Sequence, residues 1–389
     1  MLKKWAILCG IGLSFGLAGC GGTQPESKAE VIQKMIDGFS AEEKVGQLLM
    51  VDFRQNADGT GMTELSKEAK KAIDAYHIGG VILFAENLDT AEQTRALTAD
   101  LQKAADVPVF IGIDEEGGLV SRLKKSNIPH ETIPAAAEIT DAAAAGDTIG
   151  RELSELGINV DFAPVADVNT NPENPVIGTR AFSSDPNTAA QKVGQFITAM
   201  EQTGVSACAK HFPGHGDTAM DSHKGETYVE HTLERLRKVE FVPFKEAIAA
   251  EVDFIMAGHI KTPNATTDSC PATLSKEMLG ILREELGYDG LIVTDAMNMG
   301  AIVEEYGSGE SAVLAVQAGA DIVLMPADLE EAAEALGSDL YTGLTAEEAR
   351  RRRFEKGNNV IFPHPIPKGN LFGYLKHITL NPLTILLML

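Results

Sequence analysis

The sequence predicts an α/β protein whose strands close into a (β/α)8 TIM barrel. Short apolar runs rich in β-forming residues alternate with longer helical segments, and nearly every run ends in polar residues. The eight runs are residues 47–53, 80–84, 108–113, 159–165, 207–211, 254–259, 291–294 and 321–325. An open doubly wound sheet is the alternative, but no glycine-rich nucleotide-binding loop follows the first run.

Sequence signals for helices also lie close to the first of these runs and after the eighth, as the barrel arrangement predicts. Ser40 and Glu43 have the spacing of a capping box and precede the apolar residues Val45 and Leu48. After the eighth run, a helix is predicted from Ala327 to about Leu336.

The ends of the predicted strands carry ionisable residues. Strands of a barrel converge at their carboxyl ends, where barrel active sites lie, so we expect these side chains to face one cavity. They are Asp114, Asp167, Lys210, His211, His259 and Asp295.

Composition narrows the class of partner. The formal charge of −23 argues against a nucleic-acid partner, which needs a basic face. The four cysteines are too few and too scattered for a disulfide framework or a zinc knuckle, and Cys208 and Cys270 are interpreted as buried small apolar residues. We expect a monomer.

The amino terminus has the pattern of an export signal. Lys3 and Lys4 precede an apolar run over residues 5–17 that is short for a membrane span. The following Leu-Ala-Gly-Cys, ending at Cys20, resembles the lipobox of bacterial lipoproteins. This predicts a signal peptide over 1–20, lipidation of Cys20, a tether over 21–29 and anchoring outside the cytoplasm. An uncleaved anchor or a simple secretory signal is the alternative.

The segment 210–223 contains three histidines and two aspartates. A metal site is one interpretation, but the proline and glycines between His211 and His215 do not give the helical spacing typical of zinc motifs. A loop leaving the strand is favoured. Asp221 lies two residues before His223, so its carboxylate can hold the imidazole tautomer and raise its basicity, as a general acid/base requires.

Asp295 ends a very apolar strand, where an unpaired buried carboxylate is costly. It is therefore paired, protonated or functional. The alternative is a structural role as the cap of the next helix.

Taken together, these motifs resemble the family 3 glycoside hydrolases, and within them the bacterial β-N-acetylglucosaminidases. The resemblance covers roughly residues 30–336 and rests on His-Phe-Pro-Gly-His-Gly at 211–216, on Asp221 and His223, and on Asp295 in Thr-Asp-Ala-Met. It implies a retaining mechanism with Asp295 as nucleophile and His223, polarised by Asp221, as acid/base. It implies no metal and no cofactor.

The same resemblance implies a sugar-binding set. Asp114 corresponds to an aspartate that binds sugar hydroxyls, Arg122 and Arg180 to arginines that contact substrate, and Lys210 and His211 to the pair that lines the pocket. Charged donors and a carboxylate in a cavity suit hydroxyl recognition.

The implied activity is exo-hydrolysis of terminal β-linked N-acetylglucosamine, with muropeptides from peptidoglycan turnover as the expected substrates. A β-glucosidase or β-xylosidase of the same family is an alternative, but the β-glucosidase branch takes its acid from a following domain that does not fit after Met325. A catalytically inactive sugar-binding lipoprotein is another. An imidazole acid/base also makes phosphorolysis conceivable, because a neutral imidazole does not repel phosphate.

The carboxyl-terminal segment breaks the barrel pattern. Residues 339–389, with the arginine run at 350–353 and a final apolar stretch too short to cross a membrane, resemble the amino terminus of a P-type cation-transporting ATPase. We interpret this tail as a fusion or truncation and assign it no pump activity; a genuine closing helix and anchor is the alternative. The barrel domain is then 30–338, with truncated closing helices and an expected loss of stability from exposed apolar surface.

Overall fold

The computed structural model describes residues 28–220 and 225–337. Cys20, Asp221, His223 and the tail 339–389 therefore lie outside the described residues, and the predictions made for them remain predictions.

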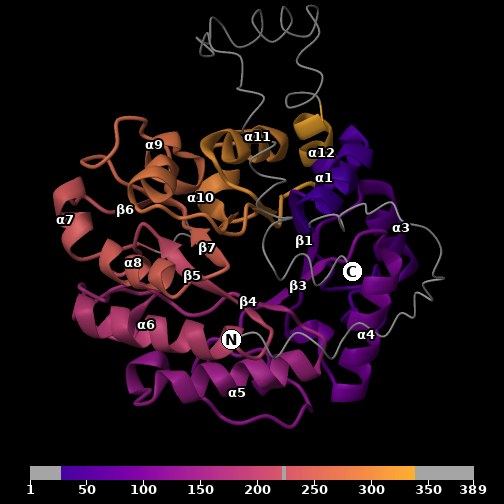
Figure 1. The fold of residues 1–389 in the computed structure, drawn as a ribbon, viewed down its shortest axis with the longest axis horizontal. Helices are drawn as coiled ribbons and strands as arrows, with labels where there is room; N and C mark the ends of the chain where they lie inside the picture. Colours follow the sequence, from indigo (N-terminus) through magenta and orange to yellow (C-terminus); the bar gives the residue numbers. More distant parts are fainter. Residues whose placement is uncertain (1–27, 221–224, 338–389) are drawn as a thin grey trace, which may run out of the picture.

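Eight parallel strands form the predicted (β/α)8 barrel (Figure 1). Their order around the sheet is β10-β1-β2-β3-β4-β5-β7-β9, and a parallel bridge between Val293 and Ile322 joins the two ends. Each strand lies within or close to one of the eight predicted runs. The strands are β1 Leu49–Asp52, β2 Gly80–Ile82, β3 Phe110–Ile113, β4 Val160–Asp161, β5 Ser206–Phe212, β7 Phe254–Ala257, β9 Leu291–Thr294 and β10 Val323–Leu324.

Helices surround the barrel and cover the outer face of its strands (Figure 1). They are α1 Lys28–Gly38, α2 Ala41–Gly46, α3 Lys67–Tyr76, α4 Ala91–Ala104, α5 Ala142–Glu155, α6 Pro186–Glu201, α7 Leu233–Lys238, α8 Phe241–Ala249, α9 Lys276–Gly280, α10 Gly300–Val303, α11 Ser308–Ala318 and α12 Leu329–Gly337. The predicted capping box is confirmed: Ser40 Oγ accepts the Glu43 N–H, and the Glu43 carboxylate accepts the Ser40 N–H.

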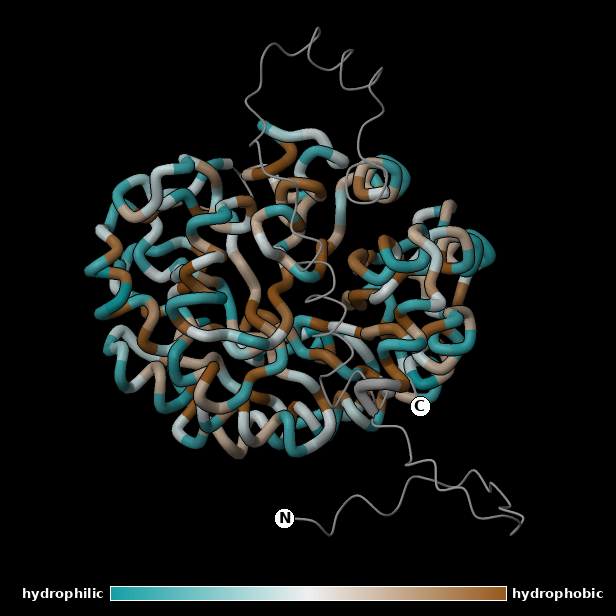
Figure 2. The backbone as a smooth tube through the Cα atoms, turned by 45° about the horizontal axis from the view of Figure 1, so that its top comes forward, coloured by the Kyte–Doolittle hydropathy of each residue, from teal (hydrophilic) through white to brown (hydrophobic). Residues whose placement is uncertain are grey.

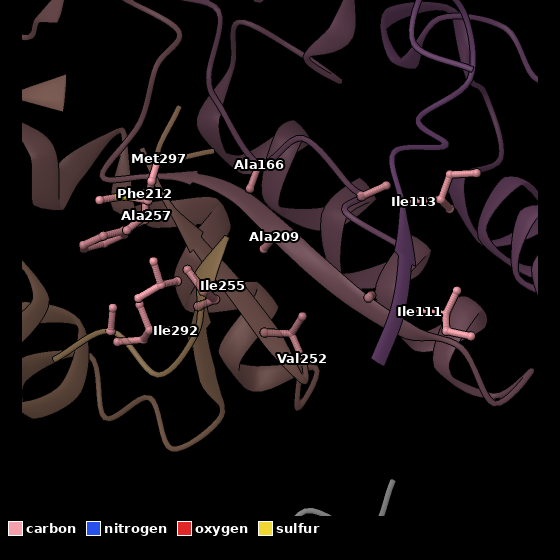
Figure 3. Close-up of a cluster of buried hydrophobic side chains, with 14 of the residues drawn as sticks. Ile111, Ile113, Ala166, Ala209, Phe212, Val252, Ile255, Ala257, Ile292 and Met297 are labelled. Carbon is pink, nitrogen blue, oxygen red and sulfur yellow. The ribbon is translucent and has the colours of Figure 1, made fainter. Parts of the chain in front are cut away.

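The core has two layers that follow from the alternation of side chains along each strand. Inside the barrel lie large apolar side chains such as Met50, Phe162 and Phe254. A second, larger layer fills the space between the strands and the helices, and Figure 3 shows part of it, with Ile111 and Ile255. Figure 2 shows the apolar segments concentrated in the centre of the molecule. The barrel is thus a packed core, and polar chemistry is confined to its ends.

A small second sheet was not predicted. β6 (Thr227–Tyr228) pairs in parallel with β8 (Ile260–Lys261). Each strand has only two residues, too short for a periodic pattern to mark it in the sequence. The pairing joins the segment after β5 to the segment after β7, at the same end of the barrel as the polar strand ends.

The last described helix packs as part of the barrel. Leu336 and Ala332 of α12 are fully buried, and α12 contacts both α2 and α11. The large apolar side chains that are exposed among the described residues lie on separate elements: Val31, Leu119, Met220, Tyr228 and Val303. None of the described helices combines the length and apolar character needed to cross a membrane.

Candidate active site

The carboxyl ends of β3, β5 and β9 place the predicted site residues at one end of the barrel. Asp114 follows β3 directly, Lys210 and His211 lie near the end of β5, and Asp295 follows β9. Arg180 ends a short 3-10 turn, Gly178–Arg180, in the long segment after β4. The parallel pairing of the barrel strands brings these ends together although they are far apart in the sequence.

Lys210 connects two carboxylates. Its Nζ lies 2.7 Å from Asp114 Oδ1 and 2.7 Å from Glu116 Oε1, and its side chain is 2% exposed. Burial alone would lower the pKa of the ammonium, but Asp114 and Glu116 outweigh burial and raise the pKa of Lys210 above its ordinary value. Lys210 is therefore a buried positive charge that two carboxylates hold in place.

Asp114 lies between two cations. Its Oδ1 accepts from Lys210 and its Oδ2 accepts from Arg122 Nη2 at 2.9 Å. Burial would raise the pKa of this carboxyl, but Lys210 and Arg122 together hold it well below its usual range. Asp114 is ionised and half-buried, so it can accept hydrogen bonds from sugar hydroxyls.

Glu116 was not predicted as a site residue, yet it holds Arg180 in place. Arg180 Nε and Nη2 each donate to one oxygen of the Glu116 carboxylate at 2.8 Å. Burial would raise the pKa of Glu116, but Lys210 and Arg180 lower it to about 2. The sequence signal was present: Glu116 lies two residues after Asp114, and alternate residues in an extended segment point to the same side.

His211 is oriented by Asp167. His211 Nδ1 lies 2.8 Å from Asp167 Oδ2, and because a carboxylate only accepts, Nδ1 carries the hydrogen. Asp167 Oδ1 also accepts the backbone N–H of His215 at 2.6 Å. Nε2 of His211 is thereby left as the atom for a ligand contact. Asp167, predicted only as a strand-end residue, fixes the imidazole and the start of the segment 213–220 after β5.

Asp295 is positioned by backbone contacts to the end of β7 and to Ala296, the residue that follows it. Its N–H donates to Ala257 O at 2.8 Å, and its Oδ1 accepts the N–H of Ala296 at 2.8 Å. The alternative that Asp295 caps the next helix is wrong, because α10 begins at Gly300 with Met299 at its N-cap. The Asp295 side chain is half-buried.

His259 supports this segment and is itself buried. Its Nε2 lies 3.0 Å from Ala296 O and its Nδ1 lies 2.8 Å from Thr273 Oγ1. Both ring nitrogens contact protein atoms, so His259 holds the residue next to Asp295 in place.

The described part of the loop after β5 contains a second histidine–aspartate contact. His231 Nε2 lies 2.8 Å from Asp217 Oδ2, and Thr170 Oγ1 donates to Asp217 Oδ1 at 2.8 Å. These contacts hold Asp217 and the described segment around it in place. No group of three His, Cys, Asp or Glu side chains within 28–220 and 225–337 is arranged to hold a metal ion.

Comparison with known proteins identifies the family. The profile described as the glycosyl hydrolase family 3 N terminal domain matches residues 40–356. The chain belongs to glycosyl hydrolase family 3. A second profile, described as the cation transporter/ATPase N-terminus, matches residues 327–389 and overlaps the first.

Curated relatives in family 3 are similar over most of this chain. Beta-hexosaminidase A of Pseudoalteromonas piscicida is 38% identical over 79% of this chain, which spans 57% of that protein. Beta-hexosaminidase LpqI of Mycobacterium tuberculosis is 34% identical over 77% of this chain and 78% of its own length. The solved family 3 β-N-acetylglucosaminidase of Paenibacillus sp. FPU-7 superposes with a TM-score of 0.73 at 37% identity, covering 86% of this chain and 68% of that one.

Within this family 3 barrel, the structure joins four of the predicted sugar-binding residues into one network. Contacts through Asp114 and Glu116 link Lys210, Arg122 and Arg180. His211 is linked separately through Asp167. The assignment of roles to these residues, and to Asp295, stays a prediction.

Proposed function

We propose that this chain is a retaining exo-β-N-acetylglucosaminidase that removes terminal β-linked N-acetylglucosamine. The observation that carries the proposal is the network of Lys210, Asp114, Glu116 and Arg180 at the same barrel end as Asp295. The names of the similar proteins, beta-hexosaminidases and a β-N-acetylglucosaminidase, support this substrate class.

The network would bind the terminal sugar in one orientation. Asp114 is an ionised acceptor, while Arg122 donates from beside it, so adjacent hydroxyls can be gripped by an acceptor and a donor together. The carboxylates of Asp114 and Glu116 balance the positive charges of Lys210 and Arg180, which fixes the positions of both cations before the sugar arrives. Binding then costs little reorganisation of the protein.

Hydrolysis would proceed by double displacement. Asp295 attacks the anomeric carbon and forms a covalent glycosyl-enzyme, while the leaving oxygen takes a proton from His223. Water then attacks the same carbon from the face opposite Asp295, the bond between Asp295 and this carbon breaks, and His223 takes a proton from the water. Two inversions restore the β configuration, and Asp221 would hold the His223 tautomer throughout.

We also propose that the protein is exported and held outside the cytoplasm by a lipid on Cys20, with peptidoglycan fragments as substrates. The lipobox-like sequence ending at Cys20 supports this proposal. Expression of the full chain with and without Cys20→Ala in a bacterium fed a radiolabelled fatty acid tests it. Label on the parent chain alone is expected, and equal label on both excludes Cys20 as the acylation site.

Activity is tested with aryl β-N-acetylglucosaminide and aryl β-glucoside, using protein that lacks residues 1–20 and Asp295→Ala as control. Fast release of the chromophore from the N-acetyl substrate alone, abolished in the control, is expected. Faster turnover of the glucoside would favour the β-glucosidase alternative. Sugar binding without turnover by folded protein would indicate a binding protein, and a sugar 1-phosphate formed on adding phosphate would indicate phosphorolysis.

A further inference from the structure

A fully buried carboxyl lies directly beneath the loop that carries the sugar-binding residues. Asp161 ends β4 and is 0% exposed. In the parallel pairing of β3 with β4 it lies opposite Ile113, the residue before Asp114. Its Oδ1 accepts the backbone N–H of Glu115 at 2.9 Å. Asp161 therefore contacts the loop at the point where it leaves the strand.

The other oxygen of Asp161 is not used to hold the fold together. Oδ2 is buried and has no hydrogen-bond partner among the described residues. Burial raises the pKa of Asp161 well above its usual value, and the nearby Glu115 and Asp114 add to this increase. The surroundings of the side chain therefore disfavour its charged form. A leucine would fit such an apolar position better, unless the contact to Glu115 matters.

The contact continues through Glu115 to the far end of the loop. Glu115 is 4% exposed, and its Oε2 accepts the backbone N–H groups of Arg122 at 2.7 Å and Leu123 at 3.1 Å. Asp161 holds the backbone of Glu115, and Glu115 holds the backbone of Arg122. These two acids fix the separation between Asp114 and Arg122.

We propose that Asp161 is a positioning residue that holds the loop 114–122 in the conformation in which Asp114 and Arg122 bind the sugar together. The inference rests on the proposed function. The positioning role requires from residue 161 a hydrogen-bond acceptor aimed at the Glu115 N–H. Asparagine supplies this acceptor in the same shape, and leucine does not.

The test compares three variants of the full chain. Asp161→Leu is expected to raise KM for aryl β-N-acetylglucosaminide about tenfold with a smaller change in kcat, because the Glu115 N–H loses its acceptor. The KM of Asp161→Asn is expected to stay within about twofold of the KM of the parent chain. Val160→Ala, on the same strand but inside the barrel, is the control: it lowers Tm and leaves KM unchanged.

Two results would overturn the proposal: the same KM in Asp161→Leu and Val160→Ala, or an Asn variant as impaired as the Leu variant. Backbone amide exchange of residues 113–123 gives a second readout that needs no turnover. Faster exchange in Asp161→Leu than in Asp161→Asn and Val160→Ala supports the positioning role, and equal exchange in all three excludes it. If the folded parent hydrolyses no substrate, the proposed function fails, and the exchange measurement still decides the role of Asp161.

Discussion

Arg180 and Glu116 are joined by two parallel hydrogen bonds of 2.8 Å, although 64 residues separate them in the sequence. Glu116 belongs to the segment after β3, and Arg180 belongs to the segment after β4. Glu116 also contacts Lys210 on β5, so this pair couples the carboxyl ends of three neighbouring strands. The planar guanidinium of arginine can donate two parallel hydrogen bonds to one carboxylate, and the ammonium group of lysine cannot.

Replacing Arg180 with lysine is therefore expected to lower kcat/KM for aryl β-N-acetylglucosaminide by about 10- to 100-fold, because one of two paired hydrogen bonds to a buried carboxylate is lost. Steady-state kinetics measures the effect. Arg151→Lys is the control, since Arg151 also donates from Nε and Nη2 to a carboxylate, to Oδ2 of Asp147 on the exposed face of α5. Equal losses in both variants would mean that the Arg180–Glu116 geometry is irrelevant to catalysis.

Asp295→Asn is expected to lower kcat by about 10³-fold or more, because the amide keeps the shape of the side chain and loses its nucleophilicity. In Asp295→Ala, which vacates this face, added azide is expected to restore turnover and to release an α-glycosyl azide, since it attacks the anomeric carbon in a single inversion. Chromophore release and product configuration by NMR are measured together.

Asp289→Asn, at an exposed position before β9, serves as the control for Asp295→Asn and should keep full activity. Asp295 is not the nucleophile if the product is a β-glycosyl azide. The same conclusion follows if kcat falls only slightly and azide does not restore turnover.

Gly216 is packed against the backbone of the loop after β4. A Cβ at this position would lie 1.9 Å from the carbonyl oxygen of Val168, which cannot move as a side chain can. Gly216→Ala is therefore expected to destabilise the protein by about 1–3 kcal/mol and to lower activity, because the backbone around residue 216 must shift away from Val168. Thermal unfolding and kinetics measure both effects.

Gly280→Ala is the matched control for Gly216→Ala. Gly280 ends α9, and an added Cβ there meets no atom within 4 Å. Alanine is expected to leave activity unchanged and to stabilise the helix by up to about 1 kcal/mol. Equal Tm losses at both positions would show that the contact with Val168 is not the cause.

The barrel could be predicted from the sequence because its signal is local. Eight apolar runs separated by helical segments mark the strands, and the convergence of strand ends then places Asp114, Lys210 and Asp295 in one region. The capping box at Ser40 is equally local, since both partners lie within one turn.

The spacing from Asp114 could have marked Glu116 as a site residue, but the partners of Glu116 and Asp167 could not be predicted, because they are distant in the sequence. Asp167 is 44 residues from His211, and a single sequence holds no record of such pairings. The helix-capping alternative for Asp295 failed for a related reason: the segment 296–299 intervenes before α10, and Ala296 is held by His259 from another strand end. Contacts between residues that are distant in the sequence determine the positions of these side chains.

At the opposite end of the barrel, Glu201 makes stability depend on pH. It ends α6, and its Oε1 accepts the backbone N–H of Asp253 at 3.0 Å. Burial, reinforced by the Asp253 carboxylate, raises the pKa of Glu201 to about 9 from an ordinary value of 4.5. The folded state therefore binds one proton more than the unfolded state between these two values. The contribution of Glu201 to stability is fully present below pH 4.5 and is lost as the pH rises toward 9.

Glu201→Gln mimics the protonated acid at every pH, so its Tm is expected to fall less than that of the parent chain between pH 5 and pH 9. Calorimetry across this range measures the difference. Glu155→Gln, at the exposed end of α5, is the control and should follow the parent. If the Glu201→Gln variant loses Tm as steeply as the parent, Glu201 is ionised in the folded protein, and the decline must come from other groups.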